Sequence, residues 1–473
     1  MSVWVKQSLS SHHKVQMFLA TLGDIQDEKF HEYQSIILSS SCISLSNLTR
    51  PSSWNQAKSA FRSCDWEKGQ FHFHVSTGDG TDGGLSEWGD YQAYKRVFAA
   101  IGVVHFPTCQ DLAQAEKEFK DKLRGYSHVI IKKIFVFGIS FEGSSTPDLS
   151  SLEDPGDVVV FPPEGSCEGG TPMVEVHMGV VLGDMAITIF NHLENEATTL
   201  KDSLATGIAG LFKQDITLKL QSPFESEEEA ADKSSRKKRG RARKWLGDLA
   251  LLAGVPLDAA EFYSASISDT KGWDALWCAG SQEGYAAALI SMTENGWNIP
   301  KEFIFKSDDD NGKTDEELLE TQVSKRCVEA LHYFGLKGQR STLEVELAFK
   351  LARFYMKYAA AEEDRVPRAM QYLRHAAEVP ELGMQAQVAR TLEVALCCRR
   401  LGLHRKSALF LSLVGAKCAE EGNAHAALVL TAIAASSYGA VPPPSEAACE
   451  DEGKAKGWAS LKKQLLELLV MQA

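Results

Sequence analysis

Hydrophobic and polar positions follow different repeats in the two halves of the chain. In the first half, short apolar or alternating stretches predict strands, and stretches with a 3.6-residue apolar repeat predict helices between them. The predicted strands are Val15–Leu22, Cys42–Leu48, Gln70–Ser76, Val97–Phe106 and Ser127–Gly138. The predicted helices are Phe30–Leu38, Asp111–Leu123 and Met173–Leu200. Strands that alternate with helices indicate an α/β domain, which we place at residues 1–221.

From residue 242 onward, apolar positions recur with a helical repeat almost continuously. After a first hairpin, the predicted helices are Leu276–Met292, Asp315–Phe334, Thr342–Ala361, Pro367–Ala377, Met384–Arg400, His404–Cys418, Ala424–Tyr438 and Gly457–Met471. The connections between them have the length that is typical of antiparallel neighbours in a helical stack. Residues 242–473 are therefore predicted to form an α-helical solenoid.

Two stretches follow neither repeat. Residues 141–170 are rich in Ser, Pro, Gly and Asp, apart from the apolar run Val158–Phe161, and predict a long surface loop. Residues 222–241 change from an acidic run to a basic run, which predicts a charged linker between the two domains.

The hairpin Arg243–Ser266 begins the helical half. Its spacing matches the helix-turn-helix repeat of the tetratricopeptide (TPR) type, in which a small residue stands where two helices touch. Gly247 supplies the small residue of the first helix, and Gly254 falls at the turn. Ala259 follows where the helices meet, and Tyr263 fills the next groove. The predicted fold class is therefore an α/β N-terminal domain followed by a TPR-like α-solenoid.

A second stretch, GLHRKSA from Gly402 onward, repeats this pattern. Gly402 is predicted to form a turn, and a basic run that faces solvent follows it as His404, Arg405 and Lys406. Ser407 is predicted to be a small contact between helices. Stacked hairpins expose an extended surface suited to proteins, so both hairpins supply candidate protein-contact or solenoid-defining positions. A helical domain without a binding groove is the alternative.

The charge of the chain limits its partners. A net charge of -13 repels nucleic acid unless basic residues are segregated on one face, and the sequence has a single basic cluster, RKKRGRARK at 236–244. This cluster could be a nuclear-localisation or phosphate-binding patch, but we favour a solvated linker and a charged helix face. No nucleic-acid partner is expected.

Cysteine usage and hydropathy indicate the compartment. The ten cysteines show no CxxC spacing, which is typical of reduced intracellular thiols. The amino terminus lacks an apolar core of signal-peptide length. The longest run without Asp, Glu, Lys or Arg, Gly422–Ser445, is better explained by a buried helix and a loop than by a membrane span. We therefore predict a cytoplasmic chain with no transmembrane segment.

No motif in the sequence predicts catalysis. The loop GDGTDGG at 78–84 lacks the Lys of a phosphate-binding loop, and Ser140 is not centred between glycines as a nucleophile elbow requires. His72 and His74 would share one face of a strand, but the sequence fixes no third metal ligand near them. We therefore predict no catalytic, cofactor-binding or metal-binding residues, and no enzyme.

Separated stretches of the chain together resemble one family, the large subunit of the type II TRAPP (transport protein particle) complex, also called the NIK- and IKK-beta-binding protein family. The stretches that carry the resemblance are Glu87–Asp90, Ile134–Gly138, Lys237–Ser266, Leu276–Leu289, Gly402–Phe410 and Gly457–Trp458. The hairpin and GLHRKSALF are the most specific of these. Family members usually continue into β-sandwich domains, whereas this chain stops at Ala473.

The resemblance implies a function and a set of partners. It implies a non-catalytic scaffold or tethering subunit of a complex that supports nucleotide exchange on Rab-family GTPases and vesicle trafficking at the Golgi. The implied partners are other TRAPP subunits and, through the complex, Rab GTPases, with peripheral membrane association. The alternative is a free-standing cytoplasmic TPR-like signalling adaptor that binds kinases or other regulators, and an enzyme built on the N-terminal sheet is the third class.

Overall fold

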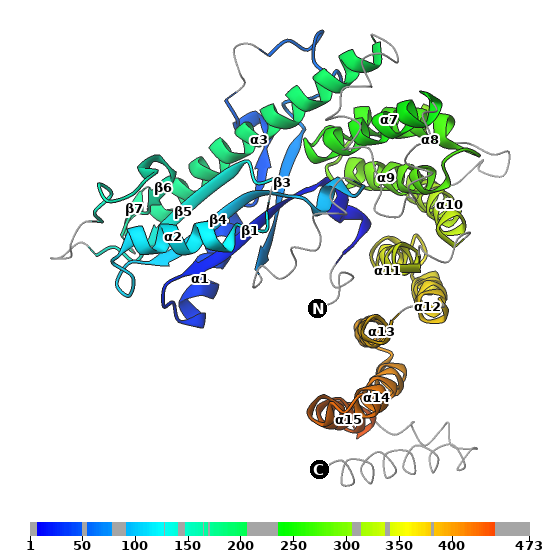
Figure 1. The fold of residues 1–473 in the computed structure, drawn as a ribbon. Coiled ribbons are helices and arrows are strands. Elements are labelled where there is room, and N and C mark those ends of the chain that lie inside the picture. The colour runs from blue at the N-terminus through cyan, green and yellow to red at the C-terminus, as the bar shows by residue number, and fades with distance from the viewer. Residues whose placement is uncertain are drawn as a thin grey trace. The chain divides into compact units, whose positions relative to one another are not determined.

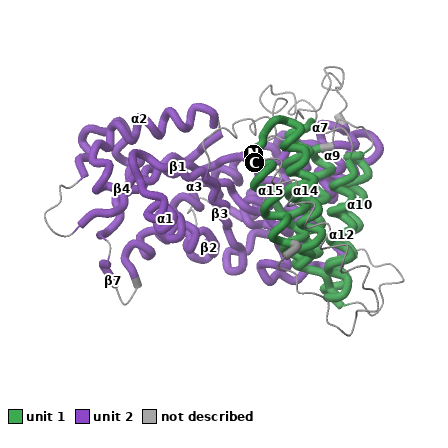
Figure 2. Tube along the Cα trace, turned by 90° about the horizontal axis from the view of Figure 1, so that it is seen from below, with its two compact units in different colours: residues 1–9, 306–473 green, residues 10–305 purple. Residues whose placement is uncertain are grey.

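The computed structural model describes residues 7–49, 54–77, 91–126, 128–140, 147–163, 165–168, 171–205, 235–304, 314–335, 341–379 and 383–439. The chain divides into two compact units (Figure 2). One unit is Ser10–Phe305, and the other combines Met1–Leu9 with Lys306–Ala473.

Six strands of the first unit form one sheet in the order β2-β3-β1-β4-β5-β6 (Figure 1). Their bounds are β1 Lys14–Leu22, β2 Cys42–Ser44, β3 Gln70–Thr77, β4 Val97–His105, β5 Ile131–Phe137 and β6 Val158–Val160. β2 is antiparallel to β3, and the other neighbouring strands are parallel. The central strands β1 and β4 are buried along nearly their whole length, as their continuous apolar runs require of strands covered on both faces.

Helices cover both faces of this sheet. Helix α2, Leu112–Lys122, packs Phe119 against Val104 and Val136 on one face. Side chains alternate along a strand, so Phe137 points to the opposite face, where it stacks on Tyr33 of α1, Asp27–Ser39, at 4.3 Å between ring centroids. The sheet is therefore the middle layer of an α/β unit.

The long helix α3, Met173–Ala205, also contributes to the core of this unit. Its residues Leu182, Ile189 and Phe190 are fully buried. Among the described residues, α3 is the one helix long and apolar enough to cross a membrane by length and composition. A core helix of a globular unit passes the same test, so the predicted lack of a transmembrane segment stays a prediction.

Three further helices complete the first unit and six described helices form the second (Figure 1). The first three are α7 Ser235–Leu252, α8 Pro256–Thr270 and α9 Ala275–Glu294. The second unit contains α10 Asp315–Gly335, α11 Ser341–Tyr358, α12 Glu362–Glu378, α13 Met384–Arg400, α14 His404–Glu420 and α15 Ala424–Gly439. Each helix of the second unit packs on the next one along the chain. The predicted fold class, an α/β region followed by a solenoid-like run of helices, is confirmed.

Some local predictions differ from the structure. The run Val158–Phe161 was predicted to lie in a loop, but its first three residues pair with β5 as the edge strand β6. The strand predicted for Cys42–Leu48 ends at Ser44, and a 3-10 turn follows. Residues 235–241 of the predicted linker are helical, because they form the start of α7.

The predicted domain boundary stays a prediction, since residues 206–234 lie outside the described part of the chain. The compact unit of the sheet nevertheless extends to Phe305 and contains α7, α8 and α9. The predicted helix Gly457–Met471 also lies outside the described residues.

Candidate partner-binding surface

Tyr263 of α8 occupies a slot between two glycines. A Cβ atom at Gly247 of α7 would lie 2.8 Å from two carbons of the Tyr263 ring, and a Cβ atom at Gly284 of α9 would overlap the same ring. The Tyr263 hydroxyl donates a 2.7 Å hydrogen bond to Asp248 Oδ1, and burial raises the pKa of this tyrosine well above its ordinary value. Ala259, one turn earlier, is also fully buried. Gly247, Ala259 and Tyr263 therefore hold helices together and present no side chain to a partner.

The turn between α7 and α8 is held against the sheet. Gly254 has φ +77° and follows the last residues of α7, whose carbonyls accept hydrogen bonds from Gly254 N and Val255 N in the Schellman pattern. A Cβ atom at Gly254 would overlap the backbone carbonyl oxygen of Gln70, the first residue of β3. The predicted turn glycine is thus also a point of close approach between hairpin and sheet.

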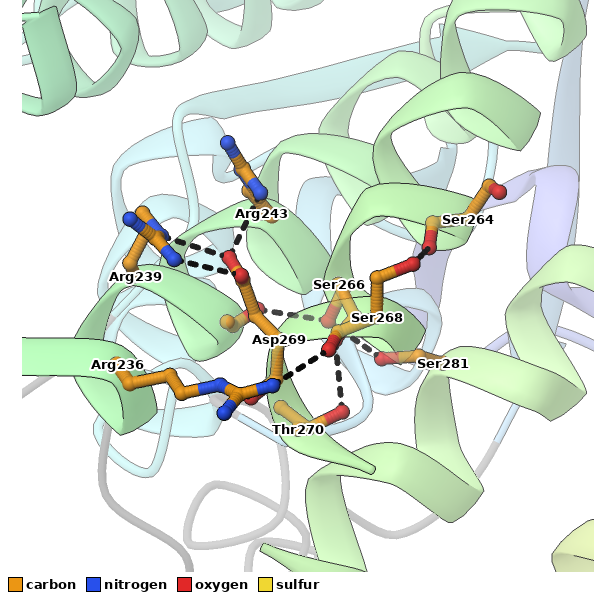
Figure 3. Close-up of polar contacts among 10 residues, drawn as sticks. Arg236, Arg239, Arg243, Ser264, Ser266, Ser268, Asp269, Thr270 and Ser281 are labelled. Carbon is orange, nitrogen blue, oxygen red and sulfur yellow. Dashed lines mark hydrogen bonds and ion pairs between the residues drawn. The ribbon is translucent and has the colours of Figure 1, made fainter. Parts of the chain in front are cut away.

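The basic cluster at 236–244 is engaged within the unit. Arg239 forms a two-pronged ion pair with Asp269, at 2.9 and 2.8 Å, and Arg243 Nη1 lies 2.7 Å from Asp269 Oδ2 (Figure 3). Arg241 pairs with Asp274 at 2.7 Å, and both side chains are buried. Lys244 donates to Asp248 at 2.6 Å and to the backbone carbonyl of Tyr91.

These pairs refine the interpretation of the cluster as a charged helix face. Three of its arginines bind Asp269 of α8 or Asp274 in the loop before α9, so they join α7 to the next two helices, and Lys244 pairs with Asp248 within α7. Removing one partner of such a buried pair leaves an uncompensated charge, which is strongly destabilising. Much of the cluster therefore stabilises the fold.

The carboxyl edge of the sheet is where ligands bind in open α/β sheets. At the end of β1, Gly23 N donates a 3.1 Å hydrogen bond to Glu118 Oε2, so a carboxylate takes the place that a phosphate would need. A Cβ atom at Gly23 would lie 2.8 Å from Cys109 Sγ. At the end of β4, the side chain of His105 forms a 2.8 Å hydrogen bond with the Tyr33 hydroxyl. Over its described residues, this edge of the sheet is thus occupied by contacts between groups of the chain itself. The loop at 78–84 lies outside the described residues.

His72 is partly buried and lies beside the buried His13 in the first unit. Its ring is 5.0 Å from that of His13, and burial lowers the pKa of both, that of His13 to about 3. His12 lies 3.1 Å from Glu283 of α9. Over the described residues, no group of three or more His, Cys, Asp or Glu side chains has an arrangement that could hold a metal ion.

The turn between α13 and α14 repeats the glycine geometry of the first hairpin. Gly402 has φ +73°, and the N–H groups of Gly402 and Leu403 donate to the carbonyls of Arg399 and Cys398. This is again the Schellman pattern, which places a glycine where a left-handed backbone is needed. Ser407 is buried against the neighbouring helices at 2% exposure.

Helix α14 presents the remaining predicted residues to solvent. His404 and Lys406 are exposed, and Arg405 is partly exposed. Leu409 and Leu413 follow Lys406 at spacings of three and seven residues, so these side chains line one face of the helix. We call Lys406, Leu409 and Leu413 the α14 stripe.

The leucines of the α14 stripe are only half covered by the described chain. Leu409 and Leu413 are each 48% exposed, whereas Leu411 and Val414 on the opposite side of α14 are buried. These leucines were not singled out from the sequence. A signal was present, since a helix with one buried face needs only one apolar stripe, and His404–Glu420 has apolar residues on two faces. Two adjacent exposed leucines beside a basic residue can dock an apolar partner surface with a polar rim.

Comparison with known proteins identifies one family. Its model, described as Trs120/TRAPPC9, N-terminal domain, matches residues 7–202 and 173–302. The chain is 27% identical over 430 residues to the trafficking protein particle complex II-specific subunit 120 homolog of Arabidopsis thaliana, which covers 88% of this chain and 32% of that protein. It is 24% identical over 436 residues to the trafficking protein particle complex subunit 9 of Homo sapiens, with 81% and 35% covered. The chain therefore spans about a third of the length of these relatives.

Proposed function

Because the chain belongs to the Trs120/TRAPPC9 family, we propose that it is a non-catalytic scaffold and tethering subunit of a TRAPP II-like complex. In this role it binds other TRAPP subunits and, through the complex, supports nucleotide exchange on Rab-family GTPases and vesicle trafficking at the Golgi. The family membership itself bears out the resemblance found in the sequence. A free-standing signalling adaptor is not favoured, since the curated relatives are subunits of trafficking complexes.

The observation that carries this proposal is the α14 stripe. Fully burying a leucine side chain is worth roughly 1.5–3 kcal/mol, so completing the burial of two half-exposed leucines also contributes about 1.5–3 kcal/mol to an interface. That amount corresponds to a change of roughly 10- to 150-fold in affinity. Lys406 and its neighbours at the start of α14 supply a charged rim.

A scaffold role also agrees with the chemistry of the first unit. His12 pairs there with Glu283 of α9, and Asp269 and Asp274 pair with arginines of α7, so these groups hold helices of the unit together. The edge of the sheet at Gly23 is closed by the carboxylate of Glu118. These contacts support a structural rather than a catalytic use of the α/β unit.

Co-purification tests the proposal. A tagged full chain, isolated from its native cells under mild conditions, should bring down small TRAPP subunits and co-localise with Golgi markers. The double variant Leu409→Asp/Leu413→Asp should lose those subunits while keeping its circular dichroism spectrum. Val328→Asp on α10 is the matched control, because Val328 is also 48% exposed in the same unit.

The result that counts against the proposal is a monomeric full chain with no TRAPP subunits. If Val328→Asp abolishes binding as completely as the leucine variant, the α14 stripe is not the contact. Reversal of Arg405 and Lys406 to Glu tests the rim. Exposed ion pairs contribute only about 0.2–1 kcal/mol each, so both positions must change to give a measurable loss.

A further inference from the structure

An exposed tryptophan stands at the loop between α8 and α9 of the first unit. Trp273 is 63% exposed, the largest fraction among the large apolar side chains that the structure describes. The loop is well defined by hydrogen bonds, since Trp273 N and Asp274 N donate to the carbonyl of Thr270 at 3.0 and 2.9 Å. Gly272, at φ +78°, allows the chain to reverse just before the indole.

Arg236 holds the indole in place. Its guanidinium lies 5.4 Å from the centroid of the Trp273 ring, a distance at which a cation is attracted to an aromatic face. The same guanidinium donates to the backbone carbonyls of Ser268 and Asp269 at 3.2 and 3.1 Å (Figure 3). Arg236 therefore caps the end of α8 and still exposes its charge. Together with the exposed Lys271, these residues form what we call the Arg–Trp patch: Arg236, Lys271 and Trp273.

The acidic side chains beside the Arg–Trp patch form ion pairs with arginines of α7. Asp269 is 9% exposed and faces Arg239 and Arg243, and Asp274 is 8% exposed and faces Arg241. The side chains of Arg239 and Arg243 remain 50% and 34% exposed. Among the described residues at this end of α7 and α8, the outward charge is therefore positive, although the whole chain carries a net charge of -13.

We propose that the Arg–Trp patch contacts the surface of a bilayer that carries anionic lipids. A tryptophan ring is apolar along its body and polar at its N–H, which suits the level of the lipid headgroups. Basic residues near an anionic bilayer each favour binding by a factor of about five, and this attraction acts only within a Debye length of about 8–10 Å. A local positive patch can therefore bind an anionic surface despite the negative total charge. This inference is independent of the α14 stripe, since it concerns the other unit.

Vesicle co-sedimentation of the purified full chain tests the inference. The chain should sediment with vesicles of phosphatidylcholine and phosphatidylserine, not with phosphatidylcholine alone, and added salt should release it. The double variant Arg236→Gln/Lys271→Gln should partition on the order of 10- to 30-fold more weakly, because two cations are lost. Gln keeps a side-chain donor for the end of α8, and Trp273→Ala tests the indole separately.

Arg124→Gln is the matched control, since its side chain is 80% exposed on the same unit and away from this loop in sequence. It should bind as the unaltered chain does, and all variants should keep the unaltered melting temperature within a few degrees. Equal binding to both kinds of vesicle, or equal loss with Arg124→Gln, overturns the proposal. Binding of free inositol hexakisphosphate without vesicle binding also overturns it, and so does capture of an acidic peptide in place of vesicles.

Discussion

Substitution of Gly254 by alanine tests whether the first hairpin and the sheet fold as one unit. A left-handed backbone costs an L-residue about 1–2 kcal/mol, and the stiffer unfolded chain of alanine returns about 0.4–1 kcal/mol. The new Cβ would also overlap the carbonyl oxygen of Gln70, which belongs to the backbone of β3 and has little freedom to move. Overpacking of this kind adds roughly 1–3 kcal/mol. We therefore expect Gly254→Ala to lower the free energy of unfolding by about 2–4 kcal/mol.

Gly296→Ala is the matched control in the same unit. Gly296 also ends a helix, α9, in the Schellman pattern, and its φ of +68° is close to that of Gly254. A Cβ atom at Gly296, however, would meet nothing within 4 Å. Only the cost of the left-handed backbone applies, so we expect a loss of about 1 kcal/mol.

Tryptophan fluorescence during urea unfolding is the suitable assay. Seven of the nine tryptophans lie between Ser10 and Phe305, so the signal reports mainly on the first unit. In thermal melts the midpoint should fall by roughly 5–12 °C for Gly254→Ala and by about 2–4 °C for Gly296→Ala. Equal shifts for the two variants would refute the reasoning, because they would show that the approach of Gly254 to β3 contributes nothing.

Three further predictions concern buried polar groups of the first unit. Asp269→Asn should lower the free energy of unfolding by about 1–3 kcal/mol, measured by urea titration, because it removes the carboxylate that two arginines share. Tyr263→Phe should cost about 1–3 kcal/mol by leaving Asp248 without one donor, and an unchanged midpoint would contradict this. His13 should make the unit acid-sensitive: burial lowers its folded-state pKa from 6.5 to about 3, so the unfolded state binds the proton first as pH falls. The free energy of unfolding is therefore undiminished above pH 6.5 and falls by up to about 1.4 kcal/mol per pH unit between pH 6.5 and about 3. The variant His13→Gln should flatten that slope in fluorescence-detected unfolding.

The helices and most strands could be predicted from local pattern because their causes are local. Glycine at Gly254 and Gly402 marks turns that require a positive φ, and both turns adopt one. The continuous apolar runs of β1 and β4 predict strands buried on both faces. The run at Val158 was harder to place, because three residues are too few to show a repeat and only pairing with β5 makes them a strand.

The contacts of the candidate surfaces depend on tertiary structure and could not be predicted in the same way. Gly247 was found by its spacing in the hairpin, but Gly284, the other wall of the Tyr263 slot, belongs to the next helix and has no fixed spacing to it. The ion pairs of Asp269 join residues 26 and 30 positions apart. The exposure of Leu409 is likewise a property of what packs on α14, which no repeat within the helix specifies.

The slot around Tyr263 has a consequence for the modularity of the helical region. A glycine within a helix costs about 1 kcal/mol relative to alanine, so Gly247 and Gly284 weaken α7 and α9 unless the tyrosine ring fills the space between them. A hairpin of α7 and α8 alone would keep this weakness and lose one wall of the slot. Unlike a repeat that can be duplicated or exchanged as a cassette, this hairpin is therefore committed to the helix that follows it.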